Sequence, residues 1–212
     1  MLGANDGIVS TASLIVGVAA SDAGRSSVLI AGVAALFAGA MSMAAGEYVS
    51  VSSQLDTEKA DLAREKSELE QQPDAEREEL VRIYQARGVE RETAASVADQ
   101  MTAHDALAAH ARDELGMSEV TSARPLQAAM TSALTFTAGA AAPLAVVPLV
   151  PASMLVPVVA TVSLACLAAL GALGARAGGA PLGPSILRVG FWGALAMAVT
   201  AGIGSLFGTA VG

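Results

Sequence analysis

The chain has 212 residues, of which 53% are hydrophobic, 15% are charged and only 3% are aromatic, and its mean hydropathy is +0.55. Seventeen of its 20 acidic and nine of its 12 basic residues lie between residues 53 and 124, so this block carries the whole formal net charge of −8. This composition excludes an ordinary soluble domain, and the lack of a basic stripe excludes a nucleic-acid binder. It is typical of a membrane protein that carries one acidic insert.

The uncharged runs predict five membrane-spanning helices. Crossing a bilayer takes about 20 apolar residues. Residues 1–20 and 26–46 each suit one span, residues 125–175 are free of formal charge over a length that suits two, and residues 189–212 supply the fifth. Prolines gather near the middle of the long third run, where the chain has to reverse direction: Pro143, Pro148, Pro151 and Pro157.

The predicted fold is therefore an all-α membrane protein with three parts. Residues 1–52 hold the first two transmembrane helices, residues 53–123 form a cytoplasmic acidic helical insert that binds metal, and residues 124–212 hold transmembrane helices three to five. Arg176 and Arg188 bracket the fourth-to-fifth connection, and the positive-inside rule places that connection in the cytoplasm. Counting back puts the N-terminus in the cytoplasm and the C-terminus outside.

The first span is not predicted to be a cleaved signal peptide, because it lacks a basic leader and contains Asp6. The chain has almost no residues before this span, which suggests a truncated start.

Helix formers and breakers divide the insert. Residues 53–71 contain neither Gly nor Pro and predict a helix, and Pro73 predicts a restart. A second helix is expected to end at Gly88, and one or two more are expected to end at Gly116. Because apolar residues are few, we expect the insert to lean on the membrane part or on a second copy of itself.

The spacing of acids in the insert indicates a metal site. Two E-x-x-E pairs and a histidine four residues before a glutamate could converge if the helices pack: Glu65, Glu68, Glu76, Glu79, His110 and Glu114. Carboxylates with one imidazole suit iron(II) or manganese(II). The alternative is that these acids form solvated helix faces or complement a helix N-terminus.

Three residues of the first two spans form a candidate transport path. An ionisable residue inside a span is a functional hypothesis by default, which singles out Asp6. Met43 and Glu47 are four residues apart and share one helix face, so a thioether and a carboxylate there would suit a borderline transition metal. The alternative is that Met43 fills an apolar gap and that both carboxylates are hydrated at the interface.

Several motifs, in order along the chain, resemble the vacuolar iron transporter family. They are NDGIVST at residues 5–11, GAMSMAAGEY at residues 39–48, the two E-x-x-E pairs and ELG at residues 114–116. The resemblance implies a bacterial member of that family that forms a homodimer, with a path between the two copies of the first and second spans.

Site residues follow from the same resemblance. Asp6 and Met43 match the family's membrane metal-site positions, and the five glutamates of the insert match its cytoplasmic ones. His110 stands where some members have a methionine. Ala35 stands where some members have a glutamate, so proton coupling would have to use Asp6 or Glu47.

The leading hypothesis is a proton-coupled transporter, not an enzyme, that exports iron(II) and/or manganese(II) from the cytosol. Its expected partners are a second copy, divalent metal ions, protons and the lipid bilayer, and no prosthetic group or nucleic acid is expected. Its expected location is a bacterial plasma membrane, as an integral membrane protein. Two alternatives stay open: a membrane-tethered di-iron-type ferroxidase, and a metal-binding or docking module that transports nothing.

Overall fold

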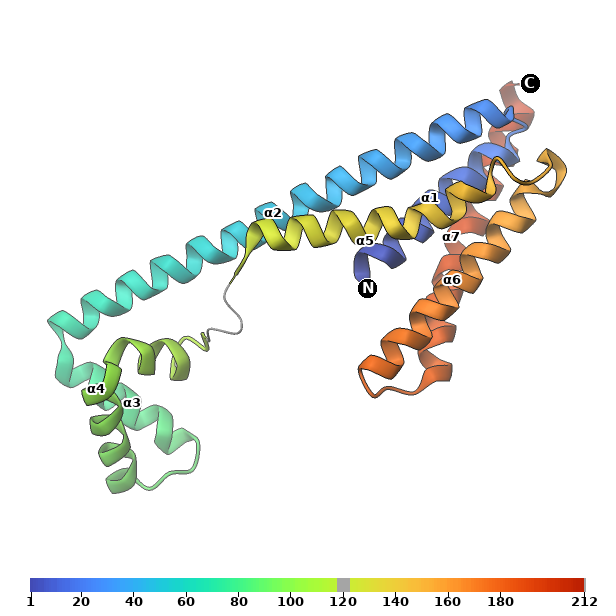
Figure 1. The fold of residues 1–212 in the computed structure, drawn as a ribbon. Coiled ribbons are helices and arrows are strands. Elements are labelled where there is room, and N and C mark those ends of the chain that lie inside the picture. Colours follow the sequence, from blue (N-terminus) through green and yellow to red (C-terminus); the bar gives the residue numbers. More distant parts are fainter. Residues whose placement is uncertain (118–122, 212) are drawn as a thin grey trace. The chain divides into compact units, whose positions relative to one another are not determined.

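The computed structural model describes residues 1–117 and 123–211, and this part of the chain is helical, without a strand (Figure 1). The end of the predicted insert, residues 118–122, and the last residue of the predicted fifth span lie outside the described residues. The helices are α1 (Leu2–Ala20), α2 (Arg25–Gln71), α3 (Pro73–Ala86), α4 (Arg91–Asp113), α5 (Pro125–Val146), the 3-10 helix η2 (Ala152–Met154), α6 (Leu155–Ala177) and α7 (Leu182–Val211).

Five of the described helices, α1, α2, α5, α6 and α7, are long and apolar enough to span a membrane. This confirms the predicted all-α class and the predicted number of candidate spans. The reversal predicted at the prolines lies between α5 and α6. The second span is not a separate helix, since α2 continues without a break for 47 residues. The fifth span begins earlier than predicted, because α7 starts at Leu182.

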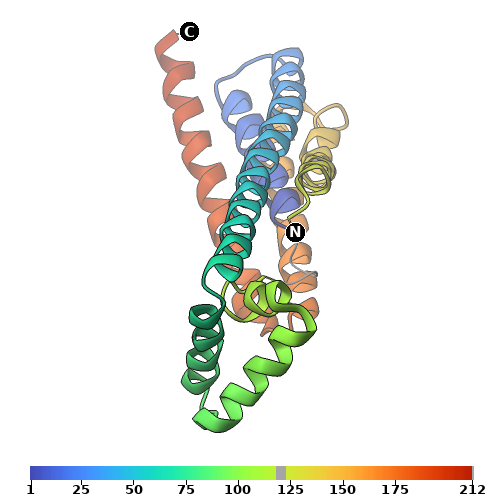
Figure 2. The ribbon, with the colours of Figure 1, turned by 90° about the vertical axis from the view of Figure 1, so that its left-hand side faces the viewer.

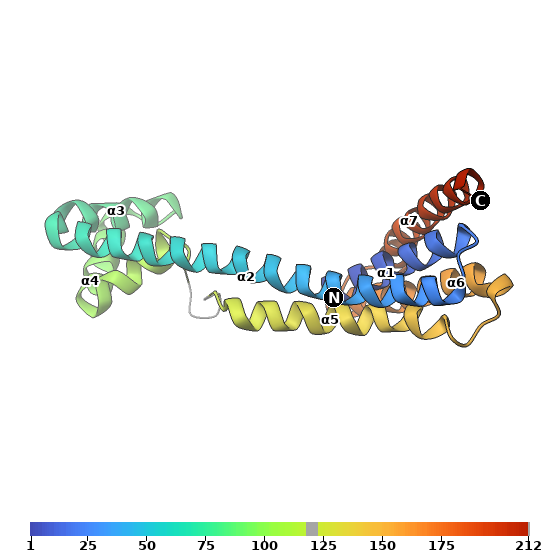
Figure 3. The same ribbon diagram turned by 90° about the horizontal axis from the view of Figure 1, so that it is seen from above.

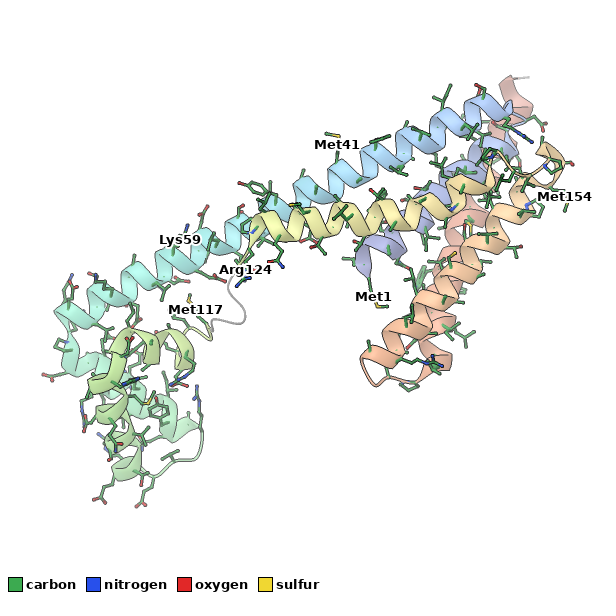
Figure 4. The ribbon with its side chains drawn as sticks, viewed as in Figure 1. Met1, Met41, Lys59, Met117, Arg124 and Met154 are labelled. Carbon is green, nitrogen blue, oxygen red and sulfur yellow. The ribbon has the colours of Figure 1, made fainter. Side chains whose placement is uncertain are left out.

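The chain forms two compact units. Residues Met1–Tyr48 with Leu126–Gly212 make one, here called the apolar unit, and Val49–Pro125 make the other, here called the acidic unit. Side chains of the acidic unit end mostly in oxygen or nitrogen, whereas those of the apolar unit are mostly carbon (Figure 4). The helices of the two units are held together by different kinds of contact.

Small residues let the helices of the apolar unit approach closely. A Cβ atom at Gly139 of α5 would overlap the backbone of Ala4 on α1, and one at Gly204 of α7 would overlap the backbone of Gly17 on α1. Gly39 of α2 receives the ring of Phe136, and α5 runs beside the first half of α2 in this unit (Figure 3). Such contacts are typical of helix packing in lipid. The hydrophobic effect does not drive helices together there, so close van der Waals contact between backbones stabilises the packing instead.

The acidic unit has a small core between α3 and α4. Its buried members are Leu80, Val81, Tyr84, Ala94, Ala98 and Ala109. Gly88 and Gly116 adopt positive φ angles of 93° and 67° just beyond the ends of α3 and α4, which confirms the predicted stops.

Helix α4 is kinked at Asp105, whose φ of −162° and ψ of 97° are not helical. The Asp105 carboxylate accepts a hydrogen bond of 3.0 Å from the backbone N–H of Ala108 and so caps a new helical start. The two segments of α4 point in different directions (Figure 2). Residues 106–113 therefore form a short segment of their own.

Candidate metal centre

Four of the predicted ligands meet inside the acidic unit. Glu65 comes from α2, Glu76 from α3, His110 from the end of α4, and Glu114 directly follows α4. One ligand atom from each lies within 4.8 Å of all the others. His110 Nδ1 is 2.9 Å from Glu65 Oε1, 2.9 Å from Glu114 Oε2 and 3.9 Å from Glu76 Oε2. Three carboxylates thus surround one ring nitrogen.

This cluster is buried, and protein groups do not satisfy all of its hydrogen-bonding atoms. Glu65 is 2% exposed, His110 is fully buried and Glu76 is 8% exposed, whereas the side chain of Glu114 is 27% exposed. His110 Nδ1 hydrogen-bonds Glu114 Oε2, so Glu65 Oε1, although 2.9 Å from the same nitrogen, has no hydrogen bond, and His110 Nε2 is buried without a partner. Burying several carboxylates together is costly unless a cation compensates their charge. The donor set, three carboxylates and one imidazole, fits a divalent transition-metal ion.

Mutual repulsion and burial shift the protonation of these acids. Burial first, and then the neighbouring charges of Glu114, Glu76 and Glu68, raise the pKa of Glu65 to about 7, although His110 acts to lower it. Burial also raises the pKa of Glu76, to which the charge of Glu79 adds. The metal-free cluster therefore retains a proton near neutral pH, and a divalent cation would displace it.

Local sequence explains how each side chain arrives at the cluster. Pro73 begins α3, so Glu76 lies in the first turn of that helix. His110 and Glu114 are four residues apart and so share a face, and the backbone N–H of Glu114 donates to the carbonyl of His110 at 2.9 Å. Gly116 then turns the chain away from the helix.

Glu68 and Glu79, the other two predicted ligands, are not members of the four-residue group. Both are partly exposed, and Glu79 lies 4.0 Å from Arg82 in an ion pair. They act on the cluster through their charge, since Glu68 and Glu79 raise the pKa values of Glu65 and Glu76 respectively. The structure thus separates the six predicted ligands into four that meet and two beside them.

The model of the VIT family matches residues 1–205.

The chain belongs to the VIT family.

Similar proteins agree with this VIT-family assignment. The "Vacuolar iron transporter" of Acanthamoeba castellanii is 50% identical over 207 residues, which cover 97% of this chain and 76% of that protein. "Vacuolar iron transporter homolog 1" of Oryza sativa subsp. japonica is 37% identical over 98% of this chain and 72% of its own length. "Vacuolar iron transporter homolog 2" of Arabidopsis thaliana is 37% identical over 98% of this chain and 82% of its own length. The resemblance seen in the sequence motifs is confirmed.

The membrane candidates of this VIT-family chain do not all share one cavity. Asp6 lines a cavity of about 290 Å³ between α1 and α7, which Arg188 and Trp192 also line. Met43 and Glu47 are partly buried on α2 and do not line that cavity. From the sequence, Arg188 served only to orient the spans across the membrane. The sequence did not indicate that Arg188 and Asp6 line one cavity, because 182 residues separate them and no local pattern links them.

Proposed function

We propose that this protein is a metal-ion transporter that exports iron(II), and also manganese(II), from the cytosol in exchange for protons. Membership of the VIT family and the names of the similar proteins support iron as a transported ion. The single observation that carries the proposal is the buried meeting of Glu65, Glu76, His110 and Glu114.

The chemistry of the donors favours these two ions. Three carboxylates and an imidazole, with no sulfur among the four, suit iron(II) and manganese(II) better than a soft ion such as copper(I). The net charge of −8 carried by residues 53–124 would raise the local concentration of cations around the cluster. The acidic unit then acts as the cytoplasmic gathering site for the transported ion.

Proton exchange follows from competition at the same oxygens. A proton and a metal ion cannot occupy one carboxylate oxygen together, so each displaces the other. The pKa of Glu65, about 7, supports this exchange at the pH of a cytosol. In the membrane, Asp6, Met43 and Glu47 would pass the ion onward, and protonation of the carboxylates would release it on the far side.

A homodimer would complete this path. The first half of α2 exposes a row of large apolar side chains at helical spacing: Ile30, Val33, Phe37, Met41 and Tyr48. Met41 is 72% exposed and points away from the other helices of the apolar unit (Figure 4). We propose that a second copy covers this row and brings the two sets of Asp6 and Met43 to one path.

Metal uptake into proteoliposomes with and without a pH gradient tests the proposal. Iron(II) and manganese(II) uptake should follow the gradient and stop when an ionophore collapses it. Asp6→Asn and Met43→Ala should abolish transport, and Glu65→Gln should slow it. Glu58→Gln is a matched control, because Glu58 is a partly exposed glutamate of α2 that lies outside the four-residue group and accepts a hydrogen bond from Gln54 of the same helix.

Two results would contradict the proposal. Wild-type transport rates in Asp6→Asn and Met43→Ala would exclude the proposed path. Oxygen consumption on adding iron(II), without gradient-dependent uptake, would favour the ferroxidase instead.

A further inference from the structure

A polar network ties the ends of α3 and α4 together beside the metal cluster. Tyr84 Oη donates to Asp113 Oδ2 at 2.9 Å, and Arg87 Nη1 donates to Asp113 Oδ1 at 2.7 Å. Arg87 Nη2 also donates to the backbone carbonyl of Asp113 at 2.9 Å. The Arg87 guanidinium lies 5.8 Å from the centre of the Tyr84 ring. Both carboxylate oxygens and the carbonyl of Asp113 are thereby held by Tyr84 of α3 and by Arg87, the residue directly after α3.

The held residue lies in the same helical turn as two proposed ligands. Asp113 follows His110 by three residues and immediately precedes Glu114. The Asp113 side chain is 11% exposed and Tyr84 is buried, so the network is not a loose surface pair. A displacement of this turn would move both the imidazole and the Glu114 carboxylate.

The turn needs such a tether because its helix is short. The kink at Asp105 separates residues 106–113 from the rest of α4, and Gly116 turns the chain away just afterwards. A helix of about two turns is marginal on its own, and helix ends fray. Ala109 packs in the small core, and within the described residues Tyr84 of α3 and Arg87, directly after α3, hold this segment by hydrogen bonds.

We propose that Tyr84, Arg87 and Asp113 form a clamp that positions His110 and Glu114 for metal binding. The clamp residues are positioning residues, because they hold the backbone and do not supply ligand atoms to the cluster. The inference rests on the proposed metal-binding function of the acidic unit. Groups that orient metal ligands typically change affinity by about 10–100-fold when removed.

The chain offers a matched control in a second Arg–Asp pair between the same helices. Arg77 donates through Nε and Nη2 to the Asp99 carboxylate, the latter at 2.8 Å. Asp99 lies in the first segment of α4, before the kink. Loss of this pair removes an α3–α4 link of the same chemistry without releasing residues 106–113.

The experiment measures manganese(II) affinity of the full chain in detergent, well below its unfolding temperature. The manganese(II) binding that is lost in Glu65→Gln is the part that the four-residue cluster contributes. Arg87→Gln should lower the affinity of that part by about tenfold, and Arg77→Gln should leave it within about twofold. Arg87→Lys should restore part of the loss, because lysine keeps the charge but not the forked geometry.

A second variant and a spectroscopic signature guard against misfolding. Tyr84→Phe keeps the ring in the core, removes one hydrogen bond and should lower the affinity by about threefold. The ligand-field absorption of bound cobalt(II) should change in Tyr84→Phe and Arg87→Gln but not in Arg77→Gln, which a general loss of stability would not produce.

The inference is overturned if Arg87→Gln and Arg77→Gln weaken binding by the same factor, or if Tyr84→Phe binds and absorbs like the wild type. Equal manganese(II) binding by the wild type and Glu65→Gln would overturn the proposed function itself.

Discussion

The two units of this protein solve helix packing in opposite ways. In the apolar unit, helices meet through glycine, and the hydroxyls of Thr135, Thr161 and Thr200 bond carbonyls of their own helix. In the acidic unit, charged side chains link neighbouring helices, as Arg77 and Arg87 do. In lipid, moving an apolar side chain from the acyl chains into a helix interface gains little free energy, so the close fit of backbones determines the packing. In water, burial of apolar surface is favourable, and exposed ion pairs are tolerated.

The largest effect on stability is expected from adding one methyl group between helices of the apolar unit. Gly139→Ala would force a Cβ into the backbone of Ala4, and neither backbone can yield easily. We expect a loss of about 1–3 kcal/mol or more, seen as a lower unfolding temperature in detergent. Gly202→Ala is the control, since nothing lies within 4 Å of a Cβ there. It should be neutral or gain up to about 1 kcal/mol. Equal destabilisation by both would contradict close packing.

In the acidic unit, metal affinity should separate the ligands that meet from those beside them. Glu65→Gln and Glu76→Gln should each lower manganese(II) affinity by at least about tenfold, because each removes a buried donor. Glu68→Gln and Glu79→Gln should lower it by only about two- to threefold, because they remove a partly exposed charge. Titration calorimetry on the full chain measures both. Equal losses at all four positions would show that the four-residue group is not the whole site.

The raised pKa of Glu65 gives a pH dependence with a defined sign. Between pH 4.5 and about 7, the folded metal-free chain holds a proton that the unfolded chain releases, so this group's contribution to stability falls as pH rises through that window. Metal affinity should rise over the same window, because the proton leaves. Since Glu65→Gln mimics the protonated acid, it should gain stability over the wild type between about pH 5 and about pH 8 without metal. A pH-independent difference would contradict this.

The smallest effect is expected at Arg25, which binds a loop of the apolar unit. Arg25, the first residue of α2, donates to the carbonyls of Val150 at 2.5 Å and Pro148 at 3.4 Å. Because the side chain is exposed, Arg25→Ala should cost about 1 kcal/mol in thermal unfolding. Arg176→Ala should change less, since Arg176 has no side-chain hydrogen bond or ion pair within the described residues. A larger loss of stability in Arg176→Ala than in Arg25→Ala would show that a positive charge at the membrane interface contributes more than the contact of Arg25 with the loop.

The class of the fold, the number of candidate spans and the helix stops at Gly88 and Gly116 could all be predicted from the amino-acid sequence. These features depend on composition and on local backbone preferences, which a single segment already contains. The motifs were also sufficient to indicate the VIT family, which the family match confirmed.

Which acids meet depends on the tertiary fold. Glu65 and Glu68 are indistinguishable by spacing, yet Glu65 is buried against His110 of α4, whereas Glu68 is partly exposed. The same holds for Asp113, which reads as one more surface acid until Tyr84 and Arg87 are seen to hold it. Contacts between residues distant in sequence depend on packing geometry, and no local pattern encodes that geometry.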